Sequence, residues 1–215
     1  MLRFQLFSFP VAIHWSFWIT AAFLSGLFRA GSPEQFQLGL LAVVVVAMSI
    51  LWHELGHAFF MRRYGGSRPN IYLYWLGGLA STQTAGYSDR QKIIISAAGP
   101  AAGFLLAGVF FVVLAEWGEG MTPMARHVLG IGLFINIFWN LLNLIPVYPL
   151  DGGQILEAVI GGRRPMLVYQ ISLVVAIGAA VACLMAGLTF FAILLGFLAY
   201  ENYQRMNFRS PRSPW

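Results

Sequence analysis

The chain carries the pentapeptide His53-Glu54-Leu55-Gly56-His57, whose residue types and spacing suit metal chemistry. On an α-helix, residues four apart share a face, so both imidazoles can reach one metal ion. The glutamate can then lie beside an open coordination position and accept a proton from water. The alternative is a pair of core histidines with a capped glutamate. Three ionisable groups in an apolar helix are costly without a function, so the motif predicts a catalytic zinc site.

A catalytic zinc site usually has three protein ligands, so two histidines leave it one ligand short. Asp151 ends a later apolar stretch, at the membrane depth expected for the motif. Pro146 and Pro149 break the helix before it, and irregular backbone at this depth is tolerated where it lines a protein or water-filled cavity. The alternative role of Asp151 is to cap a helix over 152–160. We expect it to be the third metal ligand.

Asparagines recur at helical spacing upstream of Asp151, at positions 136, 140 and 143, and share one helix face. For Asn136 we expect a hydrogen bond to a neighbouring helix, as is common for membrane asparagines. Asn143 and Asn140 are candidate substrate-binding residues, and interhelical bonding is an equal alternative for Asn140. We expect His14 to pack between helices or at the interface rather than to reach the metal.

The elements that position these residues are predicted to be membrane helices. Only 10% of the 215 residues are charged and 59% are hydrophobic, whereas a soluble domain carries about 25% charged residues. This composition excludes a soluble globule, a disordered chain and a nucleic-acid-binding protein that works by charge alone. The single cysteine, Cys183, excludes an intramolecular disulfide.

Charged residues divide the chain into apolar stretches, and a membrane span needs about 20 residues. The stretches are 4–28, 35–52, 93–115, 128–150 and 165–200. The first four each fit one span, the second by continuing through the His-Glu segment. The last would form a helix of about 54 Å, so it should fold back near Gly187 into helices at about 166–186 and 188–204. The sequence predicts six spans.

Basic residues are distributed very unevenly between the two sides of this map. With the N-terminus inside, 11 of the 13 basic residues lie on the inner side, and only Arg29 and Arg126 lie in outer loops. The positive-inside rule therefore predicts that both termini are cytosolic, and we expect the cell (inner) membrane. Arg62 and Arg63 mark the inner interface. His57 and His53 then lie about 8 and 14 Å deeper, so the metal site is nearer the cytosolic side.

Residues 69–87 are uncharged but rich in aromatic and β-prone residues, so we expect a β-hairpin rather than a span. Gly77-Gly78 is the expected turn. The predicted fold class is an all-α polytopic membrane protein with this small β element on the cytosolic side, between the second and third helices.

Two motifs together resemble the site-2 protease family of intramembrane zinc metalloproteases. They are the HELGH pentapeptide on one span and, on a later span, the run Asn-x-x-Pro-x-x-x-x-Asp-Gly-Gly that ends at Gly153. The resemblance implies that His53, His57 and Asp151 bind one Zn2+ ion. It also implies that Glu54 is the general base and that Asn143 lies near the substrate.

The resemblance covers about residues 38–160, which we expect to form the catalytic core, followed by a helical pair at about 165–204. We expect residues 1–215 to form a single membrane-embedded domain of minimal form, with no room for a PDZ or paired nucleotide-binding module. Gly99-Pro100 also resembles the family's Gly-Pro segment. Gly103 stands where the family usually has asparagine, so we assign no polar role there.

The function that the resemblance implies is regulated intramembrane proteolysis: hydrolysis of peptide bonds in or near transmembrane segments. The expected partners are a transmembrane-protein substrate and the lipid bilayer, without nucleic acid. A prenyl-protein type of membrane peptidase would need a downstream glutamate ligand, which is not found at suitable depth. A non-catalytic metal-dependent receptor or scaffold is the other alternative, and the intact Glu54 argues against it. We also hypothesise that an edge of the segment 70–84 pairs with unwound substrate by β-augmentation.

Overall fold

The computed structural model describes residues 1–75, 77–82, 86–160 and 164–207. The chain divides into two compact units. The first unit comprises residues 1–87 and 98–142, and the second comprises residues 88–97 and 143–215. Each unit is described in turn.

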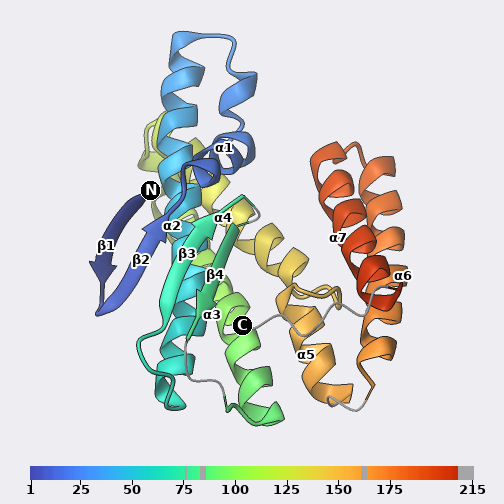
Figure 1. Cartoon of the computed structure of the whole chain (residues 1–215). Helices are drawn as coiled ribbons and strands as arrows, with labels where there is room; N and C mark the ends of the chain where they lie inside the picture. The colour runs from blue at the N-terminus through green and yellow to red at the C-terminus, as the bar shows by residue number, and fades with distance from the viewer. Residues whose placement is uncertain (76, 83–85, 161–163, 208–215) are drawn as a thin grey trace. The chain divides into compact units, whose positions relative to one another are not determined.

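A four-stranded sheet lies in the first unit, in the order β1-β2-β3-β4 (Figure 1). Its strands are β1 (Leu2–Leu6), β2 (Phe9–Ile13), β3 (Asn70–Tyr74) and β4 (Gly77–Ser81). The pairs β1–β2 and β3–β4 are antiparallel, and β2 runs parallel to β3. The sheet therefore joins two hairpins that are far apart in sequence.

The hairpin β3–β4 confirms the strands predicted between the second and third spans. The glycines predicted to form its turn instead lie in a strand. Gly77 and Gly78 lie within β4, opposite Tyr74 and Leu73, rather than forming the turn. Glycine is needed at these two positions because side chains from two helices lie directly against them and leave no room for a Cβ atom.

The N-terminal segment differs from the helix predicted over residues 4–28, and that prediction is wrong for residues 4–13. Four of the five residues of β2, Phe9, Val11, Ala12 and Ile13, are buried, so this strand packs into the core. Phe7 and Ser8 form a two-residue turn with φ of 48° and 71°, the backbone that suits a tight hairpin. Glycine or asparagine usually marks such a turn, and neither is present.

Helix α1 (Trp15–Leu24) follows the N-terminal hairpin and has only 10 residues, or about 15 Å. His14 caps it, since its imidazole accepts a hydrogen bond from the backbone N–H of Ser16. The 3-10 helix η1 (Leu27–Arg29) then leads toward the next helix.

Helix α2 (Pro33–Arg63) carries the HExxH motif near its C-terminal end. It begins with a capped first turn, in which the Ser32 side chain accepts a hydrogen bond from the backbone N–H of Gln35 and Pro33 is the first helical residue. The sheet packs against α2 and α1. The largest fully buried apolar side chains of this unit are Phe17, Ile50, Ile71, Leu73, Val11 and Val46.

Helix α3 (Asp89–Trp117) contains Pro100, and its part from Ala98 onward belongs to the first unit. The 3-10 helix η2 (Gly118–Gly120) and helix α4 (Pro123–Asn143) follow. Helix α4 carries Asn136 and Asn140 on a buried face.

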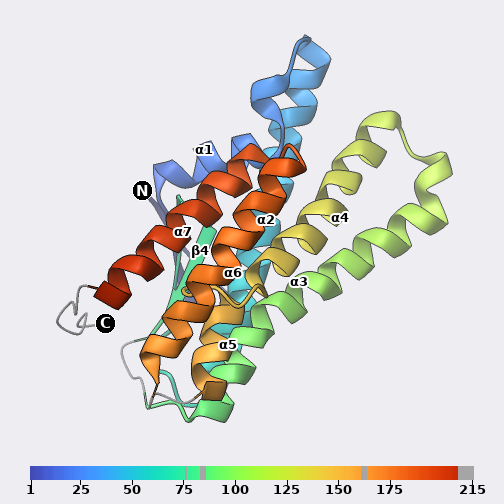
Figure 2. The same ribbon diagram turned by 90° about the vertical axis from the view of Figure 1, so that its right-hand side faces the viewer.

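The second unit contains α5 (Asp151–Ile160), α6 (Pro165–Met185) and α7 (Thr189–Asn207). Helices α6 and α7 form the predicted hairpin, with Gly187 in the turn at φ +73° (Figure 2). Val147, Ala176, Leu198 and Ala199 form a small core here. The small side chain of Ala176 lets the two helices lie close together.

Four described helical segments are long and apolar enough to cross a membrane: Pro33–Arg63, Asp89–Gly120, Pro123–Asn143 and Pro165–Met185. The short helix α1 is also apolar. The chain is therefore a mostly helical membrane protein with a small sheet.

Candidate metal centre

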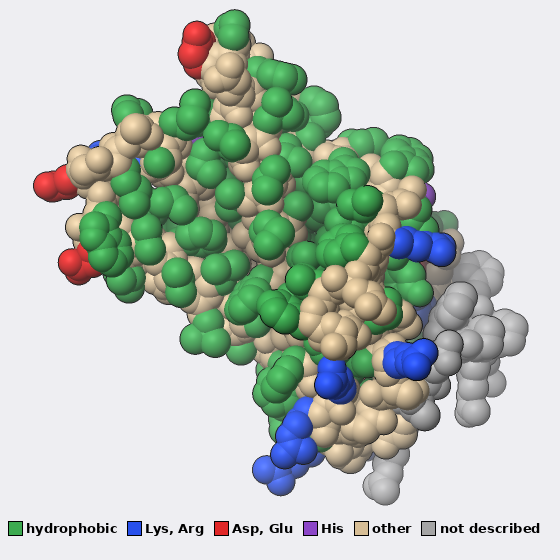
Figure 3. All heavy atoms as spheres, turned by 90° about the vertical axis from the view of Figure 1, so that its left-hand side faces the viewer, with side chains coloured by type: hydrophobic (Ala, Val, Ile, Leu, Met, Phe, Trp, Pro, Cys, Tyr) green, Lys and Arg blue, Asp and Glu red, His purple; other side chains and the backbone are tan. Residues whose placement is uncertain are grey.

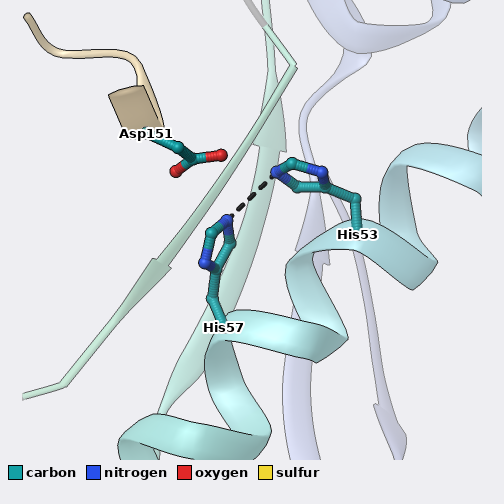
Figure 4. A group of neighbouring side chains, drawn as sticks. All are labelled: His53, His57 and Asp151. Atoms are coloured by element: carbon teal, nitrogen blue, oxygen red, sulfur yellow. Dashed lines mark hydrogen bonds between the residues drawn. The ribbon is translucent and has the colours of Figure 1, made fainter. Parts of the chain in front are cut away.

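The two histidines of the motif lie one turn apart on α2 and converge on one point (Figure 4). Their Nε2 atoms are 3.0 Å apart, and the rings are 3% and 6% exposed. The regular helix is the cause, since residues i and i+4 project from the same face. The structure thus brings together the two imidazoles that the spacing predicts.

The ring of His53 is held by an amide from α4. Its Nδ1 is 2.7 Å from Oδ1 of Asn140. The Nδ2 group of Asn140 donates to the carbonyl of Asn136, which orients the amide so that its oxygen faces the imidazole. Nδ1 of His53 therefore carries the hydrogen, and the lone pair of Nε2 faces His57. Metal-binding histidines are commonly oriented by such an outer hydrogen bond.

Asn136 joins α4 to α2 one turn earlier. Its Nδ2 group donates to Oγ of Ser49 at 2.7 Å and to the carbonyl of Gly132 at 2.8 Å. This confirms the predicted hydrogen bond to a neighbouring helix. The bond also fixes the helix face from which Asn140 reaches His53.

Glycines of α3 create the space in which these side chains lie. A Cβ atom at Gly99 would be 2.2 Å from Nε2 of His57 and 2.8 Å from Nε2 of His53. At Gly103, one turn further along, a Cβ atom would be 2.0 Å from Nδ2 of Asn140. Only glycine leaves both positions open. The sequence points to both glycines through the family resemblance but gives no reason for them.

Glu54 lies on the neighbouring face of α2 and is buried, at 4% exposure. Its side chain lies against β4, since a Cβ atom at Gly78 would be 2.3 Å from Cγ and from Oε1 of Glu54. Burial raises the pKa of Tyr74 on the adjacent strand, and the charge of Glu54 raises it further. Sequence reasoning missed Gly78 as part of this site.

Asp151 belongs to the second unit, where it is the first residue of α5 and is 6% exposed. The Gly-Gly pair after it packs on the loop before it. A Cβ atom at Gly152 would be 2.2 Å from the carbonyl oxygen of Leu144, and one at Gly153 would be 2.4 Å from the backbone nitrogen of Tyr148. Close backbone packing therefore holds the aspartate at the helix start.

Two polar side chains anchor this loop to the C-terminal helices. The backbone N–H of Tyr148 donates to Oγ of Ser172 on α6 at 3.0 Å. The carbonyl of Tyr148 accepts from Nδ2 of Asn202 on α7 at 2.6 Å. Ser172 and Asn202 are fully buried, so the loop conformation depends on the α6–α7 hairpin. Sequence reasoning did not single out either residue.

The donor atoms suit zinc, which takes imidazole nitrogen and carboxylate oxygen. A tetrahedral zinc with nitrogen ligands at about 2.0–2.1 Å holds them about 3.3 Å apart. The 3.0 Å between the two Nε2 atoms is close to this value. The room at Gly99 lies directly beside these atoms. The residues present therefore fit the metal.

The first unit brings His53, Glu54, His57 and Asn140 together. Asn143 and Asp151 lie in the second unit. The predicted substrate-binding roles of Asn140 and Asn143 stay predictions, although His53 is the observed partner of the Asn140 amide oxygen.

Comparisons with known proteins find relatives of this chain that are named zinc metalloproteases or putative zinc metalloproteases. The chain is 33% identical over 125 residues to sll0528 of Synechocystis sp., covering 57% of this chain and 32% of that protein. It is 29% identical over 173 residues to Rip3 of Mycobacterium tuberculosis, covering 74% and 43%. It is 25% identical over 160 residues to the zinc metalloprotease MJ0392 of Methanocaldococcus jannaschii, covering 74% and 45%. The chain thus spans about a third to a half of the length of these relatives.

A solved structure, the site-2 protease from Methanocaldococcus jannaschii, shares the fold with a TM-score of 0.63 and 21% identity. The match covers 100% of this chain and 99% of that one. The model of peptidase family M50 matches residues 41–121 and 115–187, more than half of the chain and both motifs. The chain therefore belongs to peptidase family M50.

Proposed function

We propose that this chain is a zinc-dependent intramembrane endopeptidase. It hydrolyses peptide bonds within or next to transmembrane segments of other membrane proteins. The observation that carries the proposal is the buried histidine pair beside Glu54, on a membrane helix of a family M50 chain. Relatives named zinc metalloproteases support the same activity.

In this proposal, His53, His57 and Asp151 hold one zinc ion per chain. Each residue is buried and offers one ligand atom. When bound, zinc lowers the pKa of water and polarises the scissile carbonyl. The Asn140 amide keeps the hydrogen of His53 on Nδ1 and so keeps Nε2 available as a ligand.

Glu54 is the proposed general base. It takes a proton from the attacking water and later passes it to the leaving amine. The contact with Gly78 supports this role, because the carboxylate is held between α2 and β4 rather than free to rotate.

The substrate is proposed to bind along β4. This strand is at one end of the sheet order, and its Gly78 touches the side chain of the base. A transmembrane helix must unwind before cleavage, and its freed N–H and C=O groups then need partners. Pairing with the outer edge of β4 would supply these partners and place the extended chain beside Glu54.

Single proline substitutions along Leu79–Ser81 test this strand-pairing model. Proline removes an N–H donor, so cleavage should fall at alternate positions while zinc content and folding hold. Gln5→Pro on β1, at the other edge of the sheet, is the matched control, because Gln5 pairs with Pro10 at a position where its N–H faces outward; it should cleave normally. If every folded β4 variant also cleaves normally, the substrate is held elsewhere, with Asn143 the next candidate.

For the topology, we infer six crossings with both termini and the sheet on the cytosolic side of the cell membrane. The segment from Trp15 to Arg29 would make the first crossing, which is shorter than expected, and α7 the last. The uneven distribution of basic residues supports this orientation. The two compact units would then act together as one protease domain.

A substrate trap tests the proposed function. The Glu54→Gln variant, purified from cells, should accumulate a membrane protein that purified wild-type chain then cleaves. A receptor or scaffold would instead capture its partner equally in both forms, and the wild type would leave that partner intact. The His53→Ala variant serves as a control, since it lacks a metal ligand and should not cleave.

A further inference from the structure

A groove with a volume of about 840 Å³ lies in the first unit, between α2, α3 and the turn of the N-terminal hairpin. Its lining includes the small residues Gly56, Ala98 and Ala102, here called the floor, and the larger residues Trp52 and Phe59. Gly56 is required for this floor, because a Cβ atom there would be 2.4 Å from the carbonyl oxygen of Ala98. Close packing of the two helices therefore forms the hollow.

The groove is on a different face of α2 from the metal centre. Its lining residues Trp52, Gly56, Phe59 and Arg63 follow spacings of four, three and four, so they share one helix face. His53 follows Trp52 directly, and one residue is a rotation of about 100° around a helix with 3.6 residues per turn. The proposed chemistry therefore makes no use of the groove.

The length and polarity of the groove match one leaflet of a bilayer. From Trp52 to Arg63, α2 rises about 16 Å, and half of the hydrocarbon core is about 15 Å thick. The apolar wall ends at two arginines, Arg62 and Arg63, which also line the groove. Figure 3 shows hydrophobic side chains across one face of the molecule, with most of its Lys and Arg side chains gathered toward one end.

The arginines are available to an anion. Within the described part of the chain, neither Arg62 nor Arg63 forms an ion pair. The guanidinium of Arg62 instead lies over the ring of Phe9, 5.7 Å from its centroid, which holds it at the end of the groove. Across the floor, Nε1 of Trp52 donates to the carbonyl of Ala102 at 3.1 Å and keeps the apolar part in shape.

We propose that this groove binds an anionic phospholipid. One acyl chain lies along the floor between Trp52 and Phe59, and the phosphate binds Arg62 and Arg63. The charge at the groove's end favours a lipid over a transmembrane helix of another protein, because the cytosolic ends of such helices are enriched in Lys and Arg rather than in acidic residues. This proposal does not depend on the protease activity.

Native mass spectrometry of the full-length protein in detergent, titrated with phosphatidylglycerol or phosphatidylcholine, tests the proposal. The wild type should prefer phosphatidylglycerol, and Arg62→Gln/Arg63→Gln should weaken its binding about tenfold or more. Ala101→Phe, which fills the apolar part and keeps both arginines, should also weaken it. Arg90→Gln/Lys92→Gln removes the same charge outside the groove and should bind like the wild type.

Three results would overturn the proposal. The first is unchanged phosphatidylglycerol preference in the folded double arginine variant. The second is unchanged binding in Ala101→Phe, which would place the acyl chain outside the groove. The third comes from a photo-crosslinking residue at position 59 in cell membranes: if it links to a polypeptide rather than to lipid, the groove is a protein interface.

Discussion

The HExxH segment of α2 and the segment from Asn143 to Gly153 hold their acidic and imidazole groups in place by different means. On α2, helix periodicity sets the direction of His53 and His57, and side chains from other elements adjust them. In the second segment, residues 144–150 lie between α4 and Asp151 and form neither helix nor strand. Backbone packing at Gly152 and bonds to Tyr148 hold it instead.

The two segments should therefore respond differently to substitution. A substitution near the histidines changes the space or the hydrogen bonds around a ring whose backbone stays helical. A substitution near Asp151 changes the path of the backbone itself. Function should therefore be lost without unfolding in the first case, and together with local stability in the second.

The largest effect is expected for Glu54→Gln, which keeps the size of the side chain and the ligands around it. Removing a general base should lower the cleavage rate by about 10²–10⁴, while zinc content and thermal stability stay near wild-type values. A cleavage assay with metal analysis on the same preparation checks this. Near-native cleavage would mean that Glu54 is not the base.

Gly99→Ala should have the next largest effect, because its Cβ would lie 2.2 Å from Nε2 of His57. Overpacking by one methyl group costs about 1–3 kcal/mol, so zinc affinity should fall roughly tenfold to a hundredfold. Gly108→Ala on the same helix meets nothing within 4 Å and is the control. Equal zinc affinity in the two variants would contradict the assigned role of Gly99.

Asn140→Ala removes the acceptor for Nδ1 of His53. Loss of such an outer bond typically weakens metal affinity 10–100-fold, and zinc titration measures this. Asn140→Asp restores the oxygen and should recover much of the affinity, whereas a residue that serves only substrate binding would leave zinc affinity unchanged in both variants.

Asn202→Ala should have the smallest effect on zinc affinity and, unlike the preceding variants, should mainly lower stability. It removes the bond to the carbonyl of Tyr148, 2.6 Å long, so stability should fall by about 1–3 kcal/mol. We expect zinc affinity to fall only a fewfold, as a result of a looser loop. Thermal unfolding and zinc titration measure the two quantities separately. A large loss of zinc affinity without loss of stability would contradict the role of Asn202 in stabilising the loop.

The regular elements of both regions could be predicted from the sequence. The spacing within His53–His57 required only helix geometry, and the turn at Gly187 followed from the length of a helix against the membrane. The N-terminal strands were missed because Phe7 and Ser8 adopt a turn that glycine or asparagine usually marks. The pairing of β2 with β3 is long-range, so no local pattern indicates it.

The reasons for the site glycines could not be predicted either. Gly78, Gly99 and Gly103 matter because of side chains that reach them from other helices, and a single sequence gives no sign of such contacts. The same holds for the Asn140–His53 bond, which joins residues 87 positions apart. Side-chain types and local periodicity are visible in the sequence, whereas complementary shapes between distant elements are not.

In the proposed metal centre, one zinc ion is held jointly by the histidines of α2 and by Asp151. The direct test is zinc bound per chain in purified Asp151→Ala, with Asp89→Ala as the control because its carboxylate is exposed and pairs with Lys92. The wild type and the control should each hold about one zinc. The zinc affinity of Asp151→Ala should fall by more than about 100-fold, because losing a direct ligand costs more than losing an outer hydrogen bond. Full zinc occupancy in Asp151→Ala at buffered, limiting zinc would show that Asp151 is not a zinc ligand.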